Sequence, residues 1–403
     1  MILKERINKK YDILLYSTIF SIFITNLKIY IPLFLLNILY GIYLLSDLKI
    51  KVIVSKWKRS LGIFILWAIL NSFIVIVFRQ SNINYTSLIK IILNMSFLII
   101  VVTVVESQVI HFNKERLIKF LELVILINFL QIIVIYFKGG LFDDFIRGSL
   151  TKSSDAAYTI GAFNNIFGGE NKNIWASKFT FFYLLYLYTI NTFRSYCRRE
   201  KIEKIIFSTL GLLTIVLLLS RTSQIAIIIP LIFMSFSIIK NIDRKYRHYI
   251  YVSLTIFMCV ALFIFFNKFF HIKFDNTDGG FTRLIIWKES MLNLFNTHFL
   301  TGNGIGHSKN FIENVVMRSE SNLHNVFLNI TFELGIVGIL VYIRFIYQFI
   351  KEHFSKQSIW NSACILFIPV YIILNLQYLG YDNDIVCFML LMTIINKILK
   401  RGA

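Results

Sequence analysis

Charged side chains are scarce in this sequence. Only 16% of its 403 residues are Asp, Glu, Lys or Arg, whereas 57% are hydrophobic. A soluble domain carries about 25% charged residues, so the deficit argues against a soluble protein. An integral membrane protein whose helices pack in a lipid bilayer keeps the many Phe, Ile and Leu side chains out of water. The composition therefore predicts an all-α, polytopic membrane protein.

Cysteine is also rare, and other common signals are missing. The four cysteines (Cys197, Cys259, Cys364 and Cys387) share no spacing typical of a metal site or a disulfide framework. The formal net charge of +20 could suggest nucleic acid, but the charges lie in short clusters between apolar runs, as membrane topology requires. No small-residue cleavage site follows the first apolar run, so we expect that run to remain as a membrane span.

Long apolar runs fill most of the chain. A spanning helix needs about 20 largely apolar residues, and this rule predicts about twelve spans in a single membrane-embedded domain, residues 1–403, with no internal repeat. The predicted spans are 11–27, 29–48, 61–78, 87–105, 117–137, 173–191, 204–220, 222–239, 249–267, 323–347, 359–379 and 383–399.

The distribution of basic residues predicts the orientation. With a cytoplasmic N-terminus, the inner segments hold 26 of the 42 Lys and Arg residues, as the positive-inside rule requires. Both termini are then cytoplasmic, and two long loops, 138–172 and 268–322, lie on the outer face. Loops this long are uncommon unless they are functional or disordered. Their mixture of aromatics, glycines and charges is not typical of disorder, so we favour functional loops over passive connectors.

The first outer loop has a basic rim made of Arg147, Lys152, Lys172 and Lys178, with acidic residues interspersed. We interpret most of these charges as ordinary solvated surface. Arg147, close to aromatics and glycines, is the one candidate for substrate binding.

Arg221 interrupts the apolar sequence between two predicted spans. A guanidinium at membrane depth costs about 2.5–3.5 kcal/mol. It could mark a tight outer turn and extend towards water. Ser220, Thr222 and Ser223 beside it would suit such a turn and would equally suit an anion site, because Arg matches phosphate oxygens in a bidentate fashion.

In the second outer loop, Arg283 and Trp287 are spaced i, i+4 and would share one face of a helix. Such a short interfacial helix would bury Leu284, Ile285, Trp287 and Leu292 at the membrane surface, and Arg283 could simply contact lipid headgroups. Gly302, Gly304 and Gly306 follow. They lack the strand and helix of a dinucleotide fingerprint, so we expect them to form tight turns near a ligand.

His324 opens the tenth predicted span, after capping residues that include Ser319, Ser321 and Asn322. A helix N-terminus disfavours imidazolium and would keep His324 in the neutral form that a general base needs. A histidine that only satisfies a loop hydrogen bond is the alternative. Asn325 and Glu333 follow, and Gly335 and Gly338 would permit close helix packing.

Taken in order, these motifs resemble the O-antigen ligase/polymerase superfamily. The matching patterns are Ser220-Arg221, Arg283-x-x-x-Trp287, Gly302-x-Gly304-x-Gly306, His324-Asn325-x-Phe327-Leu328 and Glu333-x-Gly335-x-x-Gly338. The resemblance implies a GT-C-like glycosyltransferase of the bacterial inner membrane, with its active site facing the periplasm. It implies undecaprenyl-diphosphate-linked glycans as donor and acceptor, and no cofactor, metal or nucleotide sugar.

The same resemblance implies roles for individual residues. Arg221 and Arg283 would contact the donor diphosphate, and His324 would activate the acceptor hydroxyl, with inversion at the anomeric carbon. Substrate-binding roles would fall to Trp287, Asn325, Gly304 and Glu333, and Arg147 matches the family only poorly. A diphosphate leaving group needs preorganised positive charge, and an attacking hydroxyl needs a base.

Three functions remain open. An O-antigen or capsule polymerase, working with a chain-length regulator protein, is favoured by the composition and the long outer loops. An O-antigen ligase that transfers glycan to lipid A-core shares the motifs. A flippase for lipid-linked oligosaccharides would show repeat symmetry and charges near the midplane, whereas the charges singled out here gather at the outer face.

Overall fold

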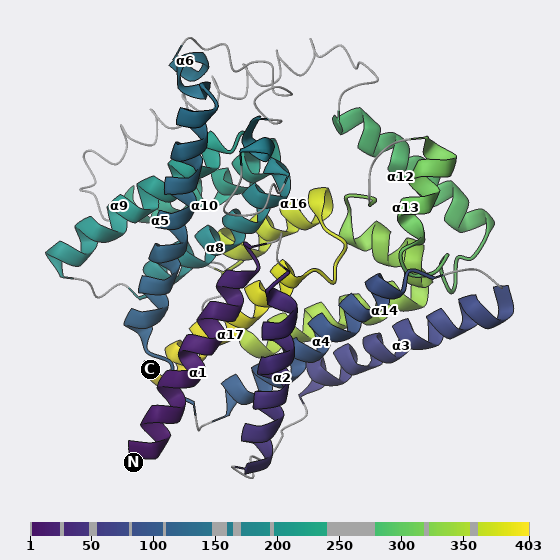
Figure 1. The fold of residues 1–403 in the computed structure, drawn as a ribbon, viewed down its shortest axis with the longest axis horizontal. Coiled ribbons are helices and arrows are strands. Elements are labelled where there is room, and N and C mark those ends of the chain that lie inside the picture. Colours follow the sequence, from purple (N-terminus) through teal and green to yellow (C-terminus); the bar gives the residue numbers. More distant parts are fainter. Residues whose placement is uncertain are drawn as a thin grey trace.

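The protein is built of α-helices (Figure 1). The computed structural model describes residues 2–24, 28–47, 55–79, 83–107, 110–146, 159–163, 171–193, 197–239, 279–317, 322–354 and 362–402, and these contain no β-strand. The longer helices are α1 (Ile2–Ser21), α2 (Tyr30–Asp47), α3 (Lys56–Arg79), α4 (Tyr85–Glu106), α5 (Lys114–Lys138), α8 (Lys172–Thr192), α9 (Arg198–Leu217), α10 (Arg221–Ile239), α12 (Gly279–Asn296), α14 (Val326–His353), α16 (Ile368–Gln377) and α17 (Asn383–Gly402). Shorter elements are α6 (Leu141–Ile146), α13 (His307–Phe311) and the π-helical turns η1 (Ile312–Val316) and η3 (Ala363–Phe367).

The helices confirm a multi-pass membrane protein. Five of them, α2, α3, α4, α5 and α14, are long and apolar enough to cross a bilayer, and two shorter apolar helices cover Arg221–Ser235 and Ala363–Gln377. Every predicted span overlaps a helix except 249–267, which lies outside the described residues. The total of twelve spans stays a prediction. The first boundary is shifted, because α1 begins at Ile2 rather than near residue 11.

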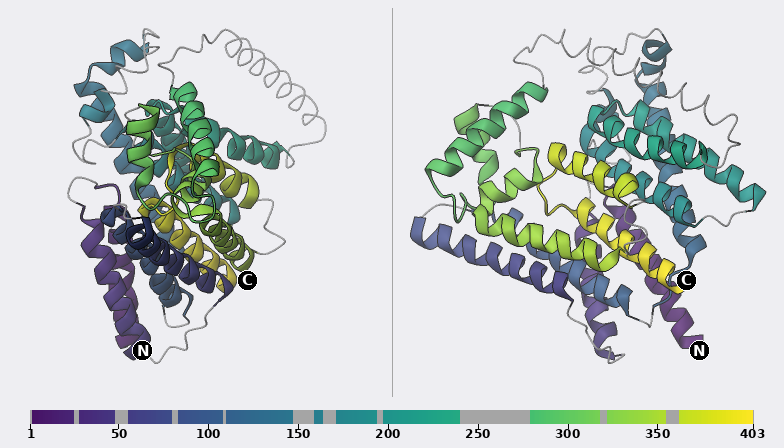
Figure 2. Two further views of the ribbon diagram at one scale, coloured as in Figure 1. Left: turned by 90° about the vertical axis from the view of Figure 1, so that its right-hand side faces the viewer. Right: turned by 180° about the vertical axis from the view of Figure 1, so that it is seen from behind.

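The two ends of the helix bundle differ. Both chain termini lie at the lower end in Figure 1, whereas α12 and α13 lie at the upper end, and the two views of Figure 2 agree. This arrangement places the described part of the second long loop opposite both termini. That the termini face the cytoplasm remains a prediction from the charge count.

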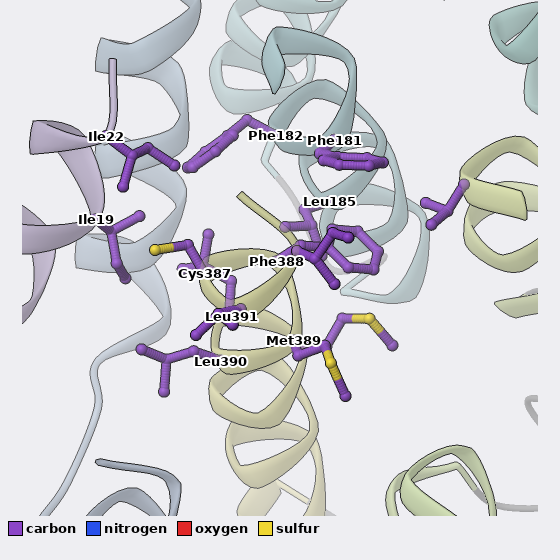
Figure 3. Packing of buried hydrophobic residues seen from close by; sticks show 14 of the residues in the cluster. Ile19, Ile22, Phe181, Phe182, Leu185, Cys387, Phe388, Met389, Leu390 and Leu391 are labelled. Atoms are coloured by element: carbon purple, nitrogen blue, oxygen red, sulfur yellow. The ribbon is translucent and has the colours of Figure 1, made fainter. Parts of the chain in front are cut away.

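Helix α17 runs through the hydrophobic core. Figure 3 shows its side chains from Cys387 to Leu391 packed against Ile19 and Ile22 from the end of α1 and against Phe181, Phe182 and Leu185 of α8. All of these residues are at least 95% buried. The first and last parts of the chain are thus packed together in one core, which fixes the start of α17 relative to α8.

Helix α14 is interrupted at Gly335, whose backbone angles (φ 70°, ψ −174°) are not helical. The interruption frees the carbonyls of residues 332–334, and other segments bond to them. Asn303 N donates to Phe332 O (2.7 Å), Gly304 N to Glu333 O (3.0 Å), and the indole Nε1 of Trp67 to Leu334 O (2.9 Å). The loop that contains Gly302, Gly304 and Gly306, called the glycine loop below, is therefore attached to α14 at the break. Helix α3 contacts the same break through Trp67.

The two glycines of α14 have different roles. A Cβ on Gly338 would lie 3.3 Å from Trp67 Nε1, so this glycine does permit the close packing of α14 on α3 that the sequence predicted. Gly335 does not, because it lies at the break, where a Cβ would collide with the carbonyl of Leu300. The prediction that both glycines serve one packing face was wrong for Gly335.

We expect Gly335→Ala to destabilise the protein strongly. Positive φ combined with extended ψ is essentially confined to glycine and costs another residue about 1–3 kcal/mol, and the collision with Leu300 adds to that. The matched control is Gly62→Ala in α3, where nothing lies within 4 Å of the added Cβ and a helical Gly→Ala change gains about 0.5–1 kcal/mol. Thermal unfolding in detergent measures both. A Gly335→Ala protein as stable as the Gly62→Ala protein would contradict the interpretation that the break in α14 requires a glycine at position 335.

Candidate functional site

The glycine loop owes its shape to its contact with α14. Gly302, Gly304 and Gly306 all have positive φ (72°, 102° and 74°), a region that glycine enters without strain. A Cβ on Gly302 would collide with the backbone of Glu333 and Gly335. The predicted tight turns are confirmed. The approach to the α14 break explains Gly302, whereas a Cβ on Gly304 would meet Val75 and one on Gly306 would meet Asn84. A role for Gly304 beside a ligand stays a proposal.

Helix α12 carries Arg283 and Trp287, and its inner face packs on the loop before α14. The predicted helix is present, but within the protein its buried positions include Ile286, Ser290 and Leu294, while Leu284 and Leu292 remain more than 45% exposed. Trp287 is partly buried and its indole Nε1 donates to Leu323 O at 2.7 Å. This hydrogen bond seats α12 against the residue next to His324.

His324 lies in a constrained turn. It is 9% exposed and has φ 52°, an uncommon conformation for a residue other than glycine. Its backbone N–H donates to Asn322 Oδ1 at 2.8 Å. The helix N-cap is Asn325, whose Oδ1 accepts from Leu328 N at 3.0 Å, so the capping residues predicted upstream of His324 were the wrong ones. His324 precedes the N-cap of α14, at the end of the helix where the positive pole of its dipole lies.

Glu333 is fully engaged inside the protein. It is 1% exposed, and its carboxylate accepts from Ser308 Oγ (2.8 Å) and Tyr381 Oη (3.0 Å). A buried carboxylate is costly unless it is hydrogen-bonded, and these contacts supply the partners. They tie α13 and the segment before α17 to α14. The geometry favours a positioning role for Glu333, and the substrate contact predicted for it remains a proposal.

Arg221 begins α10 directly after a tight turn. Helix α9 ends at Leu217, Leu219 has φ 54°, and the Arg221 side chain is exposed. The tight-turn interpretation is therefore confirmed. The hydroxyls of Ser220 and Ser223 are buried and have no hydrogen-bond partner among the described residues. The anion-site interpretation is compatible with the same turn, because these hydroxyls and the first N–H groups of α10 belong to residues next to Arg221 in the chain.

The structure groups the predicted site residues unevenly. The Trp287–Leu323 hydrogen bond places α12, which carries Arg283, against the residue next to His324. Arg221 belongs to a helix that packs on α8 and α16, and in Figure 1 α16 lies between α10 and α12. Arg147 lies outside the described residues.

The turn before Arg221 is connected to the His324 turn through the start of α8. Lys172 Nζ donates to Leu219 O at 3.4 Å, and the Arg221 guanidinium is close enough to Lys172 to repel its ammonium. Ile174, two residues further along α8, lines the same cavity as Asn322. The start of α8 thus lies between the turn before Arg221 and the cavity that Asn322 lines.

Arg79 was not predicted from the sequence as a residue of the site. This last residue of α3 donates from Nη1 to Gly302 O at 2.6 Å and from Nη2 to Thr301 Oγ1. Burial, and then the nearby Arg79 guanidinium, lower the pKa of His298 and of His307. Both histidines are thereby kept neutral near pH 7. An arginine directly after a predicted span was the available signal, and it resembled an ordinary snorkelling residue.

A cluster of buried lysine and aspartate side chains was not predicted from the sequence either. Lys178 is 1% exposed and lies 3.8 Å from Asp384, which is 3% exposed. Lys90 pairs with Asp382 at 2.7 Å. The interpretation of Lys172 and Lys178 as solvated surface was wrong, since both are buried. The signal was present, because Lys178 and Asp384 fall inside predicted spans, where an ionisable residue is expensive and usually paired.

Comparison with known families agrees with this arrangement. A family model described as O-antigen ligase matches residues 206–343. The match runs from α9 to the middle of α14 and includes every predicted site residue except Arg147. No curated protein matches the chain. Residues 206–343 of this multi-pass membrane protein therefore form a domain of the O-antigen ligase family.

Proposed function

We propose that the protein is a membrane glycosyltransferase that polymerises undecaprenyl-diphosphate-linked oligosaccharide repeat units, as in O-antigen or capsule synthesis. The observation that carries the proposal is the hydrogen bond from Trp287 Nε1 to Leu323 O. It holds an arginine-bearing helix against a buried histidine within the segment that matches the O-antigen ligase family. A cation and a base side by side are what transfer from a diphosphate carrier requires.

An apolar groove beside this site supports a lipid-linked substrate. It has a volume of about 360 Å³ and lies between α14, α16 and α17. Its lining runs along α14 from Val326, directly after the cap Asn325, to Ile350. The groove therefore extends along α14 on both sides of the break at Gly335. A polyprenyl chain lying there would present its diphosphate at the outer end, near His324.

The proposed chemistry assigns each side chain one task. Arg283 and Arg221 stabilise the charge that develops on the departing diphosphate, and a guanidinium suits this task because it donates two parallel hydrogen bonds. His324 accepts the proton of the attacking sugar hydroxyl. A single in-line displacement then inverts the anomeric carbon. Asn325 holds the first turn of α14, and Trp287 holds α12. Arg147 stays a proposed substrate contact on the first outer loop.

The donor and the acceptor in this proposal are both lipid-linked, and transfer takes place at the periplasmic face of a bacterial inner membrane. A chain-length regulator protein is the proposed protein partner. Ligation of glycan to lipid A-core is the alternative, because the family match bears the ligase description. A flippase is less favoured. The candidate residues His324, Arg283 and Arg221 lie at helix ends or in the loops beside them, whereas a transporter site lies near the bilayer midplane.

One glycan gel of a deletion strain separates these functions. We expect lipid A-core carrying a single repeat unit, because a cell without the polymerase can still ligate one unit. Bare core would instead identify a ligase. Lipid-linked repeat units trapped on the cytoplasmic side would identify a flippase. The matched control is the deletion strain complemented with the intact gene, which should restore long chains, and unchanged long chains in the deletion strain would exclude all three functions.

A further inference from the structure

A second cavity lies at the same end of the helix bundle as the His324 turn. It has a volume of about 310 Å³ and is formed by the start of α2, α4, α8 and α17 and the end of α16. Its lining includes positively and negatively charged side chains. The basic residues are Lys28, Lys90 and Lys178, and the acidic residues are Asp382 and Asp384. This size falls within the range of about 300–1,000 Å³ that is typical of small-ligand pockets.

The cavity adjoins the candidate base. Asn322 is one of its lining residues, and Asn322 Oδ1 accepts the backbone N–H of His324 at 2.8 Å. The apolar groove begins on the other side of this turn, at Val326. The first turn of α17 likewise separates the two spaces, because Asp384 lines the polar cavity and Ile385 lines the groove. His324 therefore lies between a polar and an apolar compartment.

The charges of the cavity are already largely neutralised. Lys90 pairs with Asp382 at 2.7 Å, and Asp382 Oδ2 also accepts the backbone N–H groups of Leu379 (2.8 Å) and Gly380 (3.3 Å). Lys178 Nζ donates to Ile22 O at 2.8 Å and lies 3.8 Å from Asp384 Oδ1. Lys28 adds a third cation to the lining, but a diphosphate needs a larger surplus of positive charge, and the two carboxylates in the same cavity would repel it.

Two buried oxygen atoms that line the cavity can each accept a hydrogen bond from a ligand. Gln377 is 8% exposed, and its Oε1 has no hydrogen-bond partner among the described residues. Asp384 Oδ1 also accepts no hydrogen bond within that part of the chain, although its ion-pair partner Lys178 Nζ lies 3.8 Å away. Unsatisfied buried acceptors are costly, and a ligand that donates would relieve them. Phosphate oxygens at neutral pH chiefly accept hydrogen bonds, whereas each sugar hydroxyl can donate one and accept others.

We propose that this cavity binds the terminal sugar of the glycan acceptor through its hydroxyl groups, with Gln377 and Asp384 as acceptors. The inference rests on the proposed function and deepens it. It makes the cavity the acceptor subsite, while the apolar groove holds the lipid chain of the carrier. An acceptor sugar bound here lies next to the His324 turn, where its attacking hydroxyl can lose its proton.

The test measures binding of a defined oligosaccharide to the full-length protein in nanodiscs. The probe is the repeat-unit oligosaccharide, released from the lipid-linked intermediate of the same cells by mild acid, and the method is isothermal titration calorimetry. We expect Gln377→Leu to weaken binding about tenfold, the effect of one lost hydrogen bond of about 1.4 kcal/mol. Asp384→Asn, which keeps the side-chain volume, should also weaken binding. The matched control is Asn375→Leu on the same helix, a partly exposed amide outside the cavity lining whose Nδ2 donates to Tyr371 O at 2.8 Å, and it should leave binding unchanged.

The outcomes separate this proposal from the proposed function. Equal binding of the oligosaccharide by the intact protein, Gln377→Leu and Asp384→Asn would overturn the acceptor subsite, even if glycan transfer proceeds. Displacement of the oligosaccharide by inorganic diphosphate would overturn it as well, because the cavity would then be an anion site. Binding that depends on Gln377 in a protein that transfers no glycan would retain the subsite and reject the transferase.

Discussion

His324→Asn is expected to abolish long glycan chains in cells while leaving the amount of protein in the membrane unchanged. A positioned general base contributes about 10²–10⁴-fold to the rate, and asparagine cannot accept the proton. Asparagine is the sharpest replacement, because His324 has φ 52° and Asn adopts this left-handed conformation more readily than Ala does. Loss of activity would then report lost chemistry rather than a distorted turn.

Complementation of the deletion strain, followed by a glycan gel and a membrane immunoblot, measures this effect. His111→Asn is the matched control. This exposed histidine lies between α4 and α5, away from the site, and its replacement should leave chain length normal. Normal long chains in His324→Asn cells would reject the histidine as the base. Loss of the protein from the membrane in the same cells would show that His324 acts on folding instead.

Arg283→Lys is expected to reduce glycan transfer by about 10²–10³-fold, the usual effect of removing one preorganised group from a developing charge. Lysine keeps the positive charge but cannot donate two parallel hydrogen bonds to the diphosphate. Arg283→Ala should reduce transfer further, because it removes the charge as well. A simple anchor to lipid headgroups would tolerate lysine, so an active Arg283→Lys enzyme would reject the proposed contact with the leaving group.

Turnover of purified protein with lipid-linked repeat units measures the effect of these substitutions. Lys288→Ala is the matched control, because Lys288 is an exposed cation on the same helix α12 and its loss should leave turnover nearly unchanged. A drop in turnover as large for Lys288→Ala as for Arg283→Ala would mean that the general charge of α12 matters rather than one guanidinium. Thermal unfolding of each variant separates both results from loss of the fold.

Much of the fold could be predicted because lipid imposes a simple rule. A chain that crosses a bilayer must satisfy its backbone polar groups within a helix, so apolar runs of suitable length became α2, α3, α4, α5 and α14. The local pairing of Arg283 with Trp287 was predictable for a similar reason, since residues four apart share a helix face. The predicted boundaries of the spans were less accurate. Helix α1 begins earlier than the predicted span, because a polar turn of helix has the same low hydropathy as a loop.

Predictions that depended on distant neighbours were less successful. Gly335 looked like a helix-packing residue, but the loop that includes Leu300 and Gly302 reaches the α14 backbone at that point and stabilises a break. Asn325, not an upstream residue, caps α14, since the left-handed turn at His324 delays the helix. Neither outcome follows from local pattern, because each depends on which carbonyl or side chain approaches in space.

The sequence by itself determined that this chain is an all-α membrane protein and which short motifs resemble the O-antigen ligase family. Only the tertiary structure decided which of those motifs meet. It placed Trp287 on Leu323 and paired Lys178 with Asp384, residues far apart in the chain. Helical periodicity and hydropathy are local properties encoded residue by residue, whereas a cavity between five segments exists only once distant helices pack together.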